Sequence, residues 1–77
     1  MRIIDTIEHP IMRISIFQMN QKYIVKFELG ALEQSYKFSE LDIINLEILK
    51  ADVAEKIIPN ALIRFEEMQK DLNNCLG

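Results

Sequence analysis

The chain has 77 residues, of which 49% are hydrophobic and 27% are charged. This composition excludes an intrinsically disordered chain and favours one small folded domain over residues 1–77. The net charge of -3 argues against a general nucleic-acid binder, and the single cysteine, Cys75, excludes an internal disulfide.

The sequence also shows neither a signal-peptide-like apolar region nor a long hydrophobic span, so we expect a cytoplasmic protein that does not enter a membrane.

The N-terminal stretch RIIDTIE, residues 2–8, is rich in β-branched residues and precedes Pro10, which cannot donate a hydrogen bond within a sheet. Two interpretations fit it equally. It is either a fourth, edge strand or a kinked extension of the strand that follows it.

Polar and apolar residues alternate through MNQKYIVKFELGALEQSYKF, residues 19–38, and through the segment before it. Strict alternation predicts antiparallel strands with one buried face. Asn20 and Gln21 suit the centre of a tight hairpin turn because Asn tolerates positive φ, and Gly30 with Ala31 suits a type II′ turn. These turns predict a three-stranded meander whose central strand is residues 23–29.

This register separates a mostly apolar inner face from a mixed outer face. The inner face holds Met12, Ile14, Ile16, Gln18, Tyr23, Val25, Phe27, Leu29, Leu32, Gln34, Tyr36 and Phe38. The outer face holds Ile11, Arg13, Ser15, Phe17, Met19, Lys22, Ile24, Lys26, Glu28, Glu33, Ser35 and Lys37. We therefore expect the rest of the chain to cover the inner face.

After Phe38, apolar residues recur at spacings of three and four, which is typical of amphipathic helices. Two residues are alternative helix caps: Ser39, which would form a capping box with Asp42 three residues later, and Asn45. We favour a start near Asn45. Pro59 predicts a break, with a second helix over residues 59–73. The expected fold is α+β: a three-stranded antiparallel β-meander, with or without the fourth N-terminal strand, covered on one face by two C-terminal helices.

The ionisable residues show no catalytic, cofactor or metal motif. His9 precedes Pro10 and has no partner at a motif spacing, so we expect an ordinary turn residue rather than a general base or a pH switch. One His and one Cys are too few ligands for a zinc site. We expect no enzymatic activity, no cofactor and no bound metal.

The outer face is the one surface where the sequence predicts a function. Phe17 and Ile24 form a cross-strand apolar pair with charged neighbours, which is the anatomy of a protein contact. The candidate interaction face consists of Arg13, Phe17, Ile24, Lys26, Glu28 and Lys37. A solvated sheet surface is the plain alternative. Single-stranded nucleic acid, bound by stacking and charge, is the functional alternative.

The first expected partner is a second copy of the chain, which gives a homodimer, and an unknown protein is the other. A small domain has a thin stability margin, and its exposed apolar pair favours association. The predicted edge strand at residues 31–38 offers a second route, because only Glu33 and Lys37 guard its unpaired backbone groups.

Several short motifs follow one another in the order His9-Pro10, Asn20-x-Lys22-Tyr23-Ile24-x-Lys26, Leu32-Glu33-Gln34-x-Tyr36-Lys37 and Arg64-Phe65-Glu66-x-Met68. In this order the chain resembles a family of small uncharacterised bacterial proteins of unknown function. The resemblance spans most of the chain. It implies a bacterial, cytoplasmic, stand-alone domain, and it implies no activity, ligand or functional residue.

Overall fold

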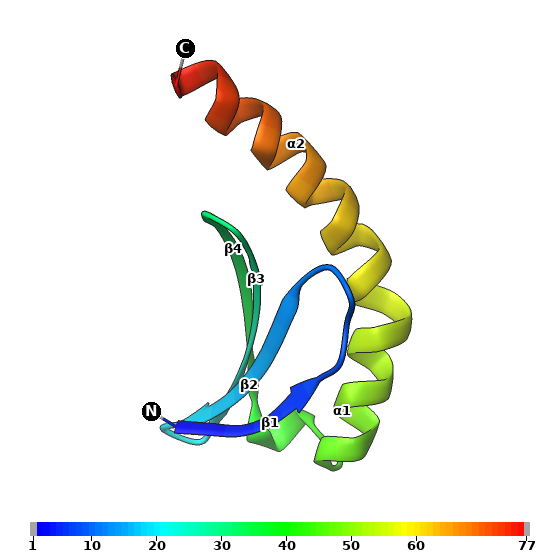
Figure 1. Ribbon diagram of the computed structural model, residues 1–77. Coiled ribbons are helices and arrows are strands. Elements are labelled where there is room, and N and C mark those ends of the chain that lie inside the picture. Colours follow the sequence, from blue (N-terminus) through cyan, green and yellow to red (C-terminus); the bar gives the residue numbers. More distant parts are fainter. Residues whose placement is uncertain (1, 77) are drawn as a thin grey trace.

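The computed structural model describes residues 2–76 and shows a four-stranded antiparallel sheet followed by one long helix (Figure 1). The strands are β1 (Arg2–Ile7), β2 (Arg13–Met19), β3 (Lys22–Leu29) and β4 (Leu32–Ser39), and they lie side by side in chain order. β1 is a separate edge strand, with a bulge between Ile3 and Asp5. The sheet therefore has four strands rather than three.

Both predicted hairpin turns form, and they set the register of the sheet. Asn20 and Gln21 have φ angles of 51° and 63°, and Gly30 has a φ of 60°. Ile16 pairs with Val25, and Val25 pairs with Tyr36 on the next strand. The antiparallel α+β class and the assignment of side chains to the two faces are confirmed.

The inner face of the sheet forms the core with one side of the helix. Ile14, Ile16, Val25 and Phe27 are at most 1% exposed. They belong to one cluster with helical residues, namely Leu49, Val53, Ala61 and Phe65. Full burial of a side chain of this size contributes about 1.5–3 kcal/mol, so this layer stabilises the domain.

Polar residues of the inner face bind helix atoms at the margin of this core. Gln34 Nε2 donates to the backbone oxygen of Ala61 at 3.0 Å, and Arg64 Nη1 donates to Tyr36 Oη at 2.7 Å. Both contacts join β4 to the helix. Gln34 and Tyr36, which the alternation placed on the inner face, thus have hydrogen-bond partners on the helix.

The helical part is one continuous helix, not the predicted pair with a break at Pro59. It consists of α1 (Leu46–Asp52), a π-helical turn (Val53–Ile57) and α2 (Ile58–Leu76). In the π turn, the amide of Ile58 donates to Val53, five residues earlier. An α-helix would press the ring of Pro59 against the carbonyl four residues before it, and the wider π turn relieves this clash. The helix therefore passes Pro59 and runs beyond residue 73.

Both candidate caps are used, each by a different element. Asn45 Oδ1 accepts from the amide of Ile48 at 2.9 Å and begins α1, as favoured. Ser39 Oγ accepts from the amide of Leu41 and begins a short 3₁₀ turn, Glu40–Asp42. The chain thus passes through the 3₁₀ turn after β4 before Asn45 begins α1.

Among residues 2–76, no helix has the length and apolar character needed to cross a membrane.

Candidate interaction face

The outer face lies on the concave side of a curved sheet. The helix follows the convex side, and the hairpin where β3 ends and β4 begins bends away from it (Figure 1). The register places all the predicted site residues on this face: Arg13 opposite Glu28, Phe17 opposite Ile24, Ile24 opposite Lys37, and Lys26 beside them. Their use as a binding site stays a prediction.

An apolar row crosses three strands of the outer face. Ile3 of β1 lies opposite Phe17 of β2, which in turn lies opposite Ile24 of β3. Ile24 is only 8% exposed, although we expected it to be an open anchor. Ile24 lies between Phe17 and Lys37 of the neighbouring strands. Ser15 likewise lies between Thr6 and Lys26, so side chains of the same face flank both buried residues on two sides.

The apolar surface that a partner can reach comes from the two other members of the row. Ile3 is 47% exposed and Phe17 is half-buried. Ile3 could not be assigned to this face from its neighbours in the chain, because residues 2–8 fitted two different arrangements. The accessible centre of the face is therefore displaced from the predicted Phe17 and Ile24 pair toward β1.

Charged residues of both signs surround this row. Lys26 Nζ lies 3.4 Å from Glu33 Oε1 and 5.9 Å from the centre of the Phe17 ring. This lysine compensates the like-charged pair of Glu28 and Glu33, which lie opposite each other in the register. Lys37 is exposed on the edge strand β4. Lys26 thus contacts both a carboxylate and an aromatic ring on this part of the surface.

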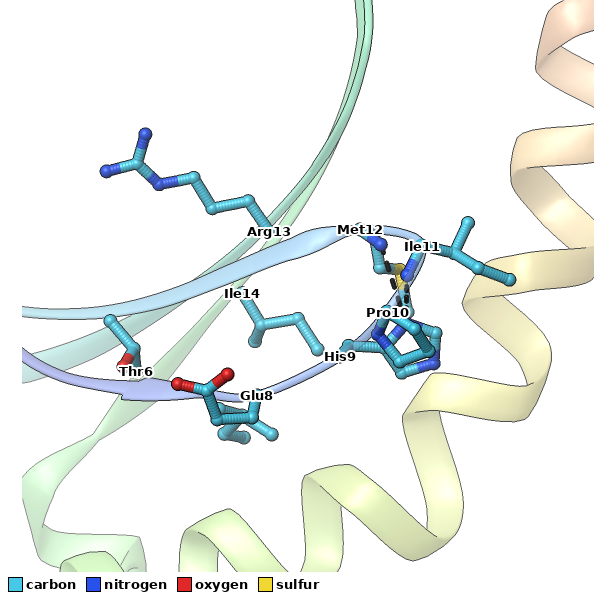
Figure 2. A pocket seen from close by; sticks show the side chains of 9 residues that line it. Thr6, Glu8, His9, Pro10, Ile11, Met12, Arg13 and Ile14 are labelled. Carbon is cyan, nitrogen blue, oxygen red and sulfur yellow. Dashed lines mark hydrogen bonds between the residues drawn. The ribbon is translucent and has the colours of Figure 1, made fainter.

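Arg13 extends from the start of β2 away from the helix (Figure 2). It lies next to a hollow of about 350 Å³ formed by the loop between β1 and β2. His9 organises this loop, since its Nδ1 accepts from the amides of Ile11 at 3.2 Å and Met12 at 3.4 Å. His9 therefore lies in the loop, and the structure adds that its side chain accepts hydrogen bonds from two backbone amides.

Two further apolar side chains are exposed at the opposite end of the sheet. Leu41 is 96% exposed and Ile44 is 83% exposed, and both follow β4. Helical periodicity could not identify them, because the 3₁₀ turn interrupts the period between Ser39 and Asn45.

The exposed cysteine, Cys75, lies near the end of α2. Within residues 2–76, no group of three or more His, Cys, Asp or Glu side chains is arranged to hold a metal ion.

No family model, no curated protein and no solved structure matches this chain. The resemblance to small uncharacterised bacterial proteins therefore stays a prediction that rests on the short motifs alone.

Proposed function

We propose that this chain is a small, non-catalytic, cytoplasmic domain that acts through protein–protein contact, and that its first partner is a second copy of itself. The contact uses the sheet side of the molecule, which comprises the outer face and the adjoining edge of β4. Among residues 2–76, the helix packs on the inner face, which leaves the opposite side of the sheet open to another chain.

The apolar row of Ile3, Phe17 and Ile24 is the observation that carries this proposal. It crosses neighbouring strands as one patch, and Arg13, Lys26 and Lys37 rim it together with Glu28. An apolar centre with a mixed charged rim is typical of a protein interface. A rim with both signs also allows a surface to be complementary to its own copy across a two-fold axis.

Sedimentation equilibrium tests the proposal directly. We expect a dimer at about 100 µM that dissociates on dilution, which corresponds to a dissociation constant of about 10 µM or below. A dilution series followed by ¹⁵N–¹H NMR should shift amides of the outer face and β4. The variant Ile63→Glu is the matched control, because Ile63 is 57% exposed on the helix. A parent chain that is monomeric at about 100 µM contradicts the proposal.

Single-stranded nucleic acid is the second candidate, and the contact of Lys26 with Phe17 favours it. A cation beside a partly exposed aromatic ring on a sheet can receive a stacked base and its phosphate. Fluorescence anisotropy with labelled oligonucleotides tests it. Affinity that falls steeply with salt and is lost in Lys26→Glu would support nucleic acid. The overall charge of -3 leads us to expect no such binding at micromolar concentrations.

A further inference from the structure

We infer that two copies of this chain pair through their β4 edges, antiparallel and centred on Ser35, to form one continuous sheet. The inference rests on the proposed function and specifies its interface. Each copy contributes the four strands of its own sheet. The two outer faces then adjoin along the seam between the β4 strands.

The two edges of the sheet differ in how they are protected. β1 is interrupted by the bulge between Ile3 and Asp5, and such irregularities hinder pairing with another strand. β4 pairs with β3 without a bulge from Leu32 to Ser39, and it contains no proline. β4 is therefore the edge that can accept a further strand.

The hydrogen-bond pattern of the β3–β4 hairpin determines which β4 residues face the free edge. In an antiparallel pair, residues that exchange backbone hydrogen bonds alternate with residues that do not. The amide of Glu40 donates to the oxygen of Gln21 at 3.0 Å, which fixes the phase of this alternation. Counted back from Glu40 in steps of two, Phe38, Tyr36 and Gln34 also exchange backbone hydrogen bonds with β3. The backbone groups of Glu33, Ser35 and Lys37 consequently point outward.

Only outward-facing residues can exchange hydrogen bonds with a second β4, and in this strand they are Glu33, Ser35, Lys37 and the terminal Ser39. Few two-fold registers therefore exist. A register centred on Glu33 opposes two glutamates, and one centred on Lys37 opposes two lysines. A register centred on Gln34 places Glu33 opposite Ser35 and Lys37 opposite Ala31. One centred on Tyr36 places Lys37 opposite Ser35 and Glu33 opposite Ser39, so neither joins opposite charges. The register centred on Ser35 alone places Glu33 of each copy opposite Lys37 of the other.

The same register also matches the remaining side chains of β4. On the inner face it opposes Leu32 with Phe38 and Gln34 with Tyr36. Leu32, Tyr36 and Phe38 are only half-buried in the single chain, so they have apolar surface left to bury. The pairing also uses the full length of the strand. Charge, apolar surface and hydrogen bonds thus select one arrangement.

A pair of charge variants tests the register specifically. Glu33→Lys opposes lysines across the seam, and Lys37→Glu opposes glutamates. Each variant alone should raise the dissociation constant by about 100-fold, because like charges are placed together. An equimolar mixture of the two variants should restore the dimer, since every cross-strand pair then joins opposite charges. Sedimentation equilibrium measures all of these species, with circular dichroism as the check on folding.

Ser35→Pro tests the edge independently of charge. The amide of Ser35 faces outward, so its loss removes no bond within the single chain but breaks the centre of the seam. We expect a folded monomer. A parent chain that is monomeric overturns the proposed function and this inference together. A dimeric Ser35→Pro variant, or a mixture that stays monomeric, overturns the β4 seam alone. Loss of the dimer in Phe17→Glu would then assign the contact to the outer face.

Discussion

Lys50 Nζ lies 2.9 Å from Asp5 Oδ2, and this contact joins the edge strand β1 to helix α1. Both side chains are about a third exposed or less, at 28% for Lys50 and 30% for Asp5. The contact connects segments far apart in the sequence. It also positions the strand that carries Ile3 of the outer face.

The Asp5 and Lys50 pair makes stability dependent on pH. The hydrogen bond from Lys50, with a second from the amide of Thr6, holds the pKa of Asp5 below its usual 3.8. The hydrogen bond to Asp5 raises the pKa of Lys50 above its usual 10.5. The Asp5 contribution is therefore present above pH 3.8 and is lost as the pH falls through the lowered pKa. The Lys50 contribution is lost as the pH rises above 10.5.

Chemical denaturation of Asp5→Asn measures this effect. The variant should be less stable than the parent at neutral pH, and the difference should shrink below about pH 4. Asp52→Asn is the matched control, since Asp52 and Lys56 form a more exposed pair within the helix, 3.5 Å apart. A difference for Asp5→Asn that does not change between neutral and acid pH would contradict the assignment.

Phe27→Ala should lower the free energy of unfolding by about 3–5 kcal/mol. The reason is that Phe27 is fully buried between the sheet and the helix, and its edge meets the ring of Tyr36, with ring centres 6.2 Å apart. Ile63→Ala removes an exposed side chain and should change the value by less than about 0.5 kcal/mol. Equal stability of the two variants in urea would show that the inner face is not the core.

Deletion of Ala54 tests the explanation for the π turn. Ala54 is exposed, and a π turn holds about one residue more than an α-helical turn. Deletion together with Pro59→Ala should give a continuous α-helix of nearly parental stability. Deletion alone should lower the free energy of unfolding by about 3 kcal/mol relative to that double variant, because the proline clash returns. Equal denaturation midpoints for the two would contradict this explanation.

His9→Ala should lower the free energy of unfolding by about 1 kcal/mol, because the amides of Ile11 and Met12 lose their acceptor. His9→Asn should retain most of the stability, since an Asn side-chain oxygen can accept at the same position. Urea denaturation compares the two variants. Equal losses would show that the imidazole acts through packing rather than through Nδ1.

The sequence by itself determined the sheet register and the two faces. A period of two assigns every side chain to a face once the turns are placed, and Asn20 and Gly30 are suited to the left-handed backbone that those turns require. The cap at Asn45 was likewise predictable, because a cap acts on amides within a few residues. The turns and the cap each depend on residues only a few positions apart, so the local sequence is enough to predict them.

Only the tertiary structure decided the features that depend on residues distant in the chain. β1 became a strand because β2 had a free edge beside it, and this brought Ile3 to the outer face. Ile24 is only 8% exposed because Phe17 of β2 and Lys37 of β4 flank it on both sides, which no pattern within β3 could reveal. The helix continued past Pro59 because Leu49 and Phe65, on either side of it, both pack on the same sheet. The free energy gained by that shared core outweighs a local preference to end the helix, and it is a property of the assembled fold.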